Sequence, residues 1–322
     1  MLGLFLAACT GPATPVPTPP DPPATGDTGA PPTPVHTADT GLPALECASI
    51  PSGPWSATQL TGPPATEDFA FDGPDLISHE NGFLTRSAHP PGPVVPWVSA
   101  QPGTVGPSSL RRLPSGDLVY HNVDTGTLYR VQPDGATTVV FSGFGYAGGI
   151  EVHPAGHIYV VDIVGLRRID PVTQDQVLGF QTAPWQSPNG ITLSVDSSVL
   201  YISAHNGIWA VPLDAAGAPS GGATLWADAP AGQFELLGMG TDRCDNVYVV
   251  TTSFTGSSTL WRYPAGGGAP VEVFAVTGGY LSNLQWGSGA GGWDAQTIYV
   301  VDRSVSAGGY WAVDVGVGEK PR

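Results

Sequence analysis

Positively charged residues are scarce in this chain of 322 residues, which has 11 Lys and Arg against 27 Asp and Glu and a single lysine, Lys320. The formal net charge is −16. Nucleic-acid binding depends on clusters of Lys and Arg that contact phosphates, so the composition argues against a nucleic-acid partner. Charged residues of both signs make up only 12% of the chain, which is about half of their usual share in globular proteins.

Several enzyme signatures and one structural pattern are also missing. The sequence contains no phosphate-binding glycine loop and no dinucleotide fingerprint, and Ser187 stands in no nucleophile-elbow string. No helical periodicity extends over ten or more residues. The sequence therefore does not support a helical fold or a serine hydrolase.

The apolar segment Met1–Ala8 is too short to span a bilayer, which takes about 20 residues.

Glycine and proline are abundant instead, with 44 and 34 copies. Together they reach about 24% of the chain, which is typical either of disorder or of a β fold with many turns. The chain also has 9 Trp, 10 Tyr and 10 Phe, which disordered sequences lack. Much of the chain therefore packs a core between turns.

The first segment, residues 1–9, resembles a lipoprotein signal. Leu6-Ala7-Ala8-Cys9 is similar to a bacterial lipobox, in which the cysteine is lipidated and becomes the mature N-terminus. This resemblance implies an exported protein with a membrane anchor on Cys9. Thr10 is not the Asp that keeps many lipoproteins in the inner membrane, so we expect the outer membrane or cell surface of a bacterium. The alternative is an unprocessed N-terminus with a stray thiol.

Residues 10–46 form a second segment that we expect to be a disordered linker. It holds eleven prolines, eight threonines and four acidic residues, and no Lys or Arg. Such a composition cannot bury enough apolar surface to offset the entropy of ordering. Its prolines favour an extended spacer between a membrane and the remaining domain, residues 47–322.

The domain contains two cysteines, Cys47 near its start and Cys244 far along it. An exported compartment permits a disulfide between them. Two buried thiols are the alternative.

One sequence pattern returns six times from residue 67 on. Each copy has an apolar alternating stretch, a turn rich in Gly or Asp, and a strand of the type Ile-Tyr-Val-Val, as in SSLRRLPSGDLVYHN and GGIEVHPAGHIYVVD. The copies start 41, 40, 41, 48 and 45 residues apart, at Glu67, Ser108, Gly148, Asn189, Leu237 and Ser282. Four short strands per unit of 40–50 residues predict an all-β, six-bladed β-propeller and exclude a β-sandwich or a β-helix.

A propeller must also close its ring, because otherwise the first and last blades keep unpaired edges. The segment Trp55–Leu60 precedes the first full repeat and alternates as a strand does. We predict that it supplies the outer strand of the sixth blade.

The repeats resemble the gluconolactonase/regucalcin (senescence marker protein) family of six-bladed propellers over roughly residues 60 to 318. The resemblance is carried by Pro188-Asn189-Gly190 before ITLSVDSSVLYIS and by the ending SNLQWG…QTIYVVD…GGYWAVDVGV. Propellers of the strictosidine-synthase or NHL-repeat type are the alternatives. The family resemblance implies a divalent cation, with Ca²⁺ preferred, on the channel axis, where it polarises the carbonyl of a sugar lactone.

The resemblance also implies which residues hold that cation, since its ligands stand at the heads of the inner strands. Glu67 matches the family's Glu and Asn189 matches the Asn of its Pro-Asn-Gly motif. Gly148 replaces a second Asn, and Leu237 replaces an Asp that also serves as general base. We therefore predict a degenerate metal site of Glu67 and Asn189, and the predicted channel lining is Ser108, Gly148, Leu237, Ser282 and Asn283.

Two functions remain open from the sequence. The first is a tethered, monomeric propeller that binds a small molecule or a protein at the channel mouth without chemistry, which Leu237 favours. The second is a divalent-metal-dependent hydrolase of sugar lactones or related esters. Its catalytic residues are not identified, because a leucine cannot replace the missing base.

Overall fold

A computed structural model of the chain describes residues 47, 50–60, 67–80, 83–90, 92–99, 107–145, 147–162, 165–180, 185–253, 256–304 and 309–321. The predictions for residues 1–9 and 10–46, including lipidation of Cys9, lie outside these residues. The described part of the chain contains no helix long and apolar enough to cross a membrane.

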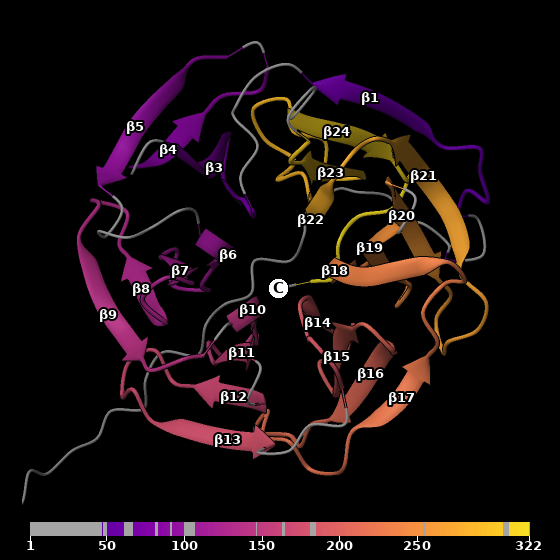
Figure 1. Cartoon of the computed structure of the whole chain (residues 1–322). Coiled ribbons are helices and arrows are strands. Elements are labelled where there is room, and N and C mark those ends of the chain that lie inside the picture. The colour runs from indigo at the N-terminus through magenta and orange to yellow at the C-terminus, as the bar shows by residue number, and fades with distance from the viewer. Residues whose placement is uncertain are drawn as a thin grey trace, which may run out of the picture. The chain divides into compact units, whose positions relative to one another are not determined.

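The described residues form six antiparallel sheets of four strands each, arranged in a ring around a central axis (Figure 1). This arrangement confirms the predicted all-β, six-bladed β-propeller. In five blades the strands follow one another along the chain from the axis outward, so each sheet is a simple meander.

The strands of the first three blades are short and regular. Blade 1 consists of β2 (Ala70–Asp72), β3 (Asp75–Glu80), β4 (Phe83–Ser87) and β5 (Val94–Ser99). Blade 2 consists of β6 (Pro107–Arg112), β7 (Leu118–Asn122), β8 (Thr127–Val131) and β9 (Thr137–Ser142). Blade 3 consists of β10 (Ala147–Val152), β11 (Ile158–Asp162), β12 (Gly165–Ile169) and β13 (Gln176–Phe180).

The other three blades repeat this plan, except that the last one takes its outer strand from the start of the domain. Blade 4 consists of β14 (Ile191–Leu193), β15 (Val199–Ala204), β16 (Gly207–Pro212) and β17 (Thr224–Ala227). Blade 5 consists of β18 (Gln233–Thr241), β19 (Val247–Ser253), β20 (Ser257–Tyr263) and β21 (Val271–Thr277). Blade 6 consists of β22 (Leu281–Trp286), β23 (Thr297–Asp302), β24 (Gly309–Asp314) and β1 (Ser56–Leu60).

The second strand of each blade explains the recurring apolar sequence. All residues of β7, β11 and β23 are buried, because each sheet is packed between two neighbouring blades. Strands covered on both faces read as continuous runs of Val, Ile and Tyr rather than as alternating patterns. In two of these hairpins the preceding turn places a glycine in the left-handed region, with φ of 89° at Gly116 and 91° at Gly156.

Strand β1 closes the ring, as predicted from the segment Trp55–Leu60. It pairs antiparallel with β24, with Ser56 opposite Asp314 and Leu60 opposite Tyr310. Blade 6 thus joins the first and last segments of the domain, which removes the unpaired edge that β24 would otherwise present.

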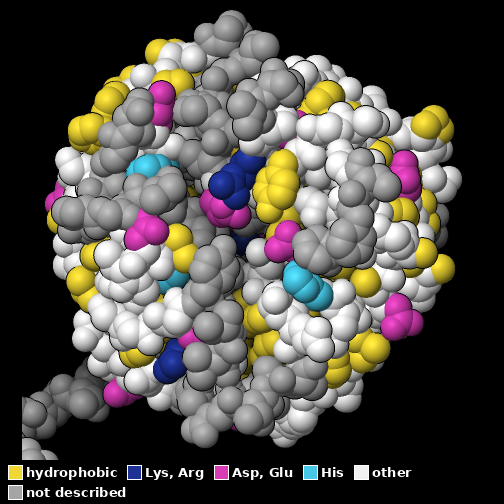
Figure 2. Space-filling view, in the orientation of Figure 1, with side chains coloured by type: hydrophobic (Ala, Val, Ile, Leu, Met, Phe, Trp, Pro, Cys, Tyr) yellow, Lys and Arg dark blue, Asp and Glu magenta, His cyan; other side chains and the backbone are white. Residues whose placement is uncertain are grey.

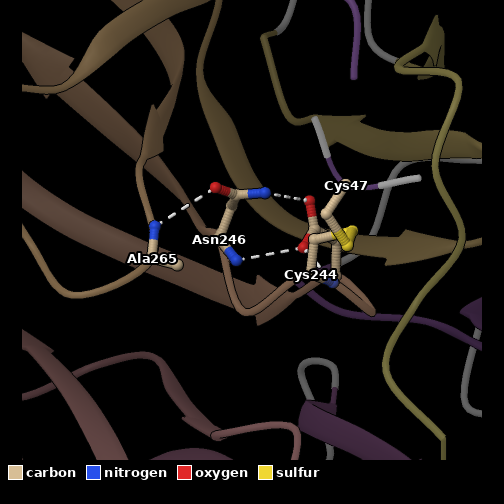
Figure 3. Close-up of a disulfide and its surroundings, with 5 residues drawn as sticks. Cys47, Cys244, Asn246 and Ala265 are labelled. Atoms are coloured by element: carbon tan, nitrogen blue, oxygen red, sulfur yellow. Dashed lines mark hydrogen bonds between the residues drawn. A yellow bond between two sulfur atoms is a disulfide. The ribbon is translucent and has the colours of Figure 1, made fainter. Parts of the chain in front are cut away.

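A disulfide between Cys47 and Cys244 fastens the start of the domain to blade 5 (Figure 3). The bond joins residues 197 apart in sequence, and the two Cα atoms are 5.5 Å apart. Beside it, Asn246 Nδ2 donates a hydrogen bond to Asp242 Oδ2 at 2.8 Å, and Asn246 Oδ1 accepts one from the backbone N–H of Ala265 at 3.2 Å (Figure 3). The alternative of two separate thiols is therefore excluded.

Candidate functional site at the channel mouth

The inner strands β2, β6, β10, β14, β18 and β22 surround the axis of the ring (Figure 1). Because the blades repeat the same strand order, these strands run in the same direction, and their first residues lie at one end of the channel. We call this end the mouth, defined by Glu67, Asn189, His205, Glu235, Tyr280 and Arg303. Figure 2 shows a small hollow at the centre of the ring, bordered by acidic, basic, histidine and hydrophobic side chains.

An ion pair joins blade 1 to blade 6 at the mouth. Arg303, which directly follows β23, donates a hydrogen bond from Nη1 to the carboxylate of Glu67. Both side chains remain accessible, with 39% of Arg303 and 31% of Glu67 exposed. Desolvation raises the pKa of Glu67, and the guanidinium of Arg303 opposes that rise. Arg303 therefore offsets part of the cost of ionising Glu67 at this partly buried position.

The surroundings fix both members of this pair. The Arg303 guanidinium carbon lies 5.6 Å from the centroid of the Tyr280 ring, and the Arg303 backbone N–H donates to the Tyr280 carbonyl at 2.7 Å. Ser282 Oγ donates to the Glu67 carbonyl at 2.9 Å. This cation–π contact stabilises the Arg303 guanidinium in its position over the Tyr280 ring. Tyr280 itself is 38% exposed.

A second polar pair lies at the mouth between blades 4 and 5. His205 follows β15, and its Nε2 is 4.0 Å from Oε1 of Glu235 in β18. Both side chains are about as accessible as Glu67. The mouth therefore presents polar groups from several blades.

Below the mouth, the channel is filled by a buried polar layer. Asp68 is fully buried and accepts four hydrogen bonds, from Phe69 N at 2.8 Å, Ser109 Oγ at 3.1 Å, Leu110 N at 2.8 Å and Arg111 Nη1 at 2.8 Å. Burial raises the pKa of Asp68, whereas Arg111 and the other donors favour its ionised form. Asp68 is thus committed to structure and is not a candidate for ligand binding.

The C-terminal segment enters the same layer and ends near the axis (Figure 1). Lys320 is 5% exposed, and its Nζ lies 3.3 Å from Glu151 Oε2 and 3.2 Å from Thr192 Oγ1. Its backbone N–H donates to the Thr241 carbonyl at 3.0 Å. The cavity left beside Glu151, Thr192 and Gln285 measures only about 10 Å³, which is the room of a single water. At this depth, the side chains beside Lys320 leave room for little more than one water molecule.

The structure places the predicted site residues in different environments. Asn189 is partly buried just before β14, and its backbone N–H donates to the Ser203 carbonyl at 3.0 Å. Asn283 Oδ1 accepts from the Leu284 N–H at 2.8 Å, so it is engaged within its own strand. Ser282 supports Glu67, as described above. Ser108 belongs to β6, but its side chain is outside the described residues.

Leu237 and Gly148, which stand where the resemblance implies metal ligands, are packing residues. Leu237 is 1% exposed and belongs to the apolar cluster of blades 5 and 6 that includes Leu281 and Tyr248. A Cβ atom on Gly148 would lie 2.7 Å from the Asn189 carbonyl oxygen, so the neighbouring strand leaves no room for a side chain. Both positions serve the contact between adjacent blades.

The residues at the mouth do not fit the divalent cation that the resemblance implies. In the described part of the chain, no three His, Cys, Asp or Glu side chains lie close enough together to hold a metal ion. The Glu67 carboxylate contacts a guanidinium, and Ca²⁺ needs six to eight oxygen ligands. A calcium site at Glu67 and Asn189 thus remains a prediction from the resemblance alone.

Three residues with specific contacts were not identified from the sequence. Arg303 and Tyr280 meet Glu67 only because blade 6 neighbours blade 1, and no local pattern indicates that contact. Lys320 stands out in the sequence as the only lysine of the chain. Its partner Glu151 could not be predicted, because the two residues are 169 positions apart.

The fold and the mouth define a six-bladed β-propeller of the architecture seen in gluconolactonase and regucalcin structures, which confirms the resemblance at the level of fold. A putative gluconolactonase superimposes with a TM-score of 0.65 at 16% identity, covering 85% of this chain and 96% of that one. A calcium-binding protein, regucalcin, from Agrobacterium tumefaciens strain C58 gives a TM-score of 0.61 at 16% identity, covering 83% and 96%.

A binding protein shares the same architecture. An auxiliary nutrient binding protein from Bacteroides ovatus gives a TM-score of 0.61 at 11% identity, covering 80% of this chain and 76% of that one. No protein-family profile matches the sequence, and no curated protein is detectably similar to it.

Proposed function

We propose that this chain is a propeller that binds a small molecule or a protein at its channel mouth without metal-dependent chemistry. The observation that carries the proposal is the ion pair of Glu67 with Arg303, which engages the carboxylate that a catalytic metal would need. The mouth nevertheless keeps accessible polar and aromatic groups, among them Tyr280, Glu235 and His205. A nutrient binding protein among the structural neighbours is consistent with such a role.

Metal analysis and a substrate panel test this proposal together. The protein is purified without chelator, its metal content is measured, and sugar lactones and esters are offered with and without added Ca²⁺ or Zn²⁺. We expect no stoichiometric metal and no turnover. Stoichiometric metal together with a hydrolysis rate lost in Glu67→Gln would overturn the binding proposal.

The alternative is a metal-dependent hydrolase of sugar lactones or related esters. It is favoured by the gluconolactonase-like fold and by Glu67 and Asn189, which the sequence resemblance matches to metal ligands of that family. This alternative needs a general base other than Leu237, whose side chain is apolar and buried.

We further propose that the domain is exported and anchored through lipid on Cys9, as a monomer without a nucleic-acid partner. The disulfide between Cys47 and Cys244 supports export, because disulfides persist in oxidising compartments. Incorporation of a palmitate analogue by the full chain in bacteria tests the anchor, with Cys9→Ser as the control. Equal labelling of both proteins would overturn it.

A further inference from the structure

The cationic group of Arg303 stands where a metal ion would have to contact Glu67. Its guanidinium donates to the Glu67 carboxylate, and the guanidinium carbon lies 5.6 Å from the centroid of the Tyr280 ring. The backbone hydrogen bond from Arg303 to Tyr280 fixes the point from which the side chain starts. Arg303 directly follows β23, the second strand of blade 6.

We propose that Arg303 is the built-in cation of the mouth: its guanidinium substitutes for a divalent metal ion, excludes such an ion from Glu67, and is the group that contacts the ligand. The inference rests on the proposed binding function and adds the residue responsible for it. An arginine remains charged at every physiological pH, so the site needs no metal supply.

The contacts at the mouth indicate the chemistry of the ligand. A guanidinium has five N–H donors, and Glu67 is the one side-chain acceptor that Arg303 contacts among the described residues. The remaining donors suit an oxygen acceptor on a ligand, and the side chain of Tyr280, a residue that is 38% exposed, lies beside them. Glu67 and Glu235 both lie at the mouth and repel an anion. The ligand is therefore expected to carry an oxygen acceptor for the guanidinium and no net negative charge.

Metal binding gives a test that does not need the natural ligand. Terbium luminescence and Ca²⁺ calorimetry are measured on the full domain for wild type, Arg303→Met and Arg303→Lys. We expect no binding to wild type at low millimolar metal. Removing the positive charge in Arg303→Met should raise metal affinity roughly tenfold or more, since like charges a few ångströms apart disfavour each other strongly. Arg303→Lys keeps the charge and should behave as wild type.

Two further variants make the result specific. Arg262 is the matched control, because its guanidinium carbon lies 5.1 Å from the Trp55 ring centroid, away from the mouth. Arg262→Met should leave metal binding absent, and Glu67→Gln combined with Arg303→Met should abolish the gain. Thermal unfolding shows that each variant is folded.

Two outcomes would overturn the inference. One is metal binding by wild type that disappears in Glu67→Gln, and the other is a folded Arg303→Met protein with no gain of metal affinity. Neither measurement depends on turnover, so the failure of this inference is distinguishable from a failure of the proposed binding function, which the lactone panel decides.

Discussion

Lys320 and Glu151 form a buried ion pair between the last residues of the domain and the third blade. The two charged atoms, Nζ and Oε2, are 3.3 Å apart, and the side chains are 4% and 6% exposed. Together with the pair of Arg111 and Asp68 it balances the charges of the layer that fills the channel. Because Lys320 also bonds Thr192 in blade 4, one side chain links three parts of the chain.

We predict that Lys320→Met strongly destabilises the domain. The substitution removes the cation of a buried ion pair, and breaking one side of such a pair costs about 3–5 kcal/mol. Urea unfolding followed by circular dichroism measures the loss. The double variant Lys320→Met with Glu151→Gln should recover most of it, because neither charge is then left alone. A single variant as stable as wild type would contradict the role of this pair.

The accessibility of Lys320 gives an independent check. Since it is the only lysine, an amine-reactive ester can modify just this side chain and a free N-terminal amine. Peptide mass spectrometry should show little modification of Lys320 in the native protein and complete modification in urea. Rapid modification of the native protein would mean that the C-terminal segment leaves the channel readily.

Acid should destabilise the domain through His121. This residue is fully buried in β7, and desolvation lowers its pKa to about 4, while the carboxylate of Asp162 acts in the opposite direction. In the unfolded chain the same histidine binds a proton below about pH 6.5. Between these values the unfolded state holds more protons, so stability falls as the pH is lowered from about 6.5 to 4. The full effect is about 3 kcal/mol.

Histidine NMR titration of the folded protein measures this pKa directly. In parallel, the pH dependence of urea unfolding should be flatter in His121→Gln than in wild type over the same range. His79 also has a lowered pKa from burial, so the difference between the two proteins isolates His121. Titration of His121 near its ordinary value in the native state would refute the prediction.

Restoring an asparagine at the third blade should damage the fold rather than create a metal ligand. In Gly148→Asn the new Cβ would lie 2.7 Å from the Asn189 carbonyl oxygen, which forces adjacent inner strands apart. Overpacking of this kind costs about 1–3 kcal/mol. Gly222→Asn is the matched control, because nothing lies within 4 Å of a Cβ there. Equal melting temperatures of the two variants would contradict the close approach.

The disulfide should contribute much of the stability of the oxidised domain. Cys47 and Cys244 enclose a loop with a sequence separation of 197, and on the loop-entropy account such a bond contributes up to about 5 kcal/mol. Cys47→Ser combined with Cys244→Ser should lower the urea midpoint by a corresponding amount. Dithiothreitol should destabilise wild type and leave the double variant unchanged. If reductant has no effect on wild type, the bond does not contribute.

The repeat made the architecture predictable from the sequence. The sequence units recur every 40 to 48 residues. Each blade packs in the same way, so the apolar pattern of its second strand is repeated in every unit. The closing strand was predictable because a ring leaves one edge to fill, and the segment before the first repeat was the available candidate.

The mouth was less predictable, because its contacts join residues far apart in the chain. Glu67 meets Arg303 across 236 residues, and only ring closure brings them together. The resemblance placed Glu67 and Asn189 at inner-strand heads but gave no indication of the guanidinium. Leu237 showed that one expected ligand was missing, yet its role in packing blade 5 on blade 6 appeared only in three dimensions.

The disulfide between Cys47 and Cys244 also determines how a pulling force on the N-terminal side of the chain is transmitted to the domain. A pull on the chain ahead of Cys47 can pass through the sulfur bridge into the β18–β19 connection of blade 5. Part of that tension therefore bypasses β1, whose hydrogen bonds to β24 would otherwise be peeled apart one after another. Force applied to the chain ahead of Cys47 would therefore reach blade 5 through a covalent bond and leave the pairing of β1 with β24 intact.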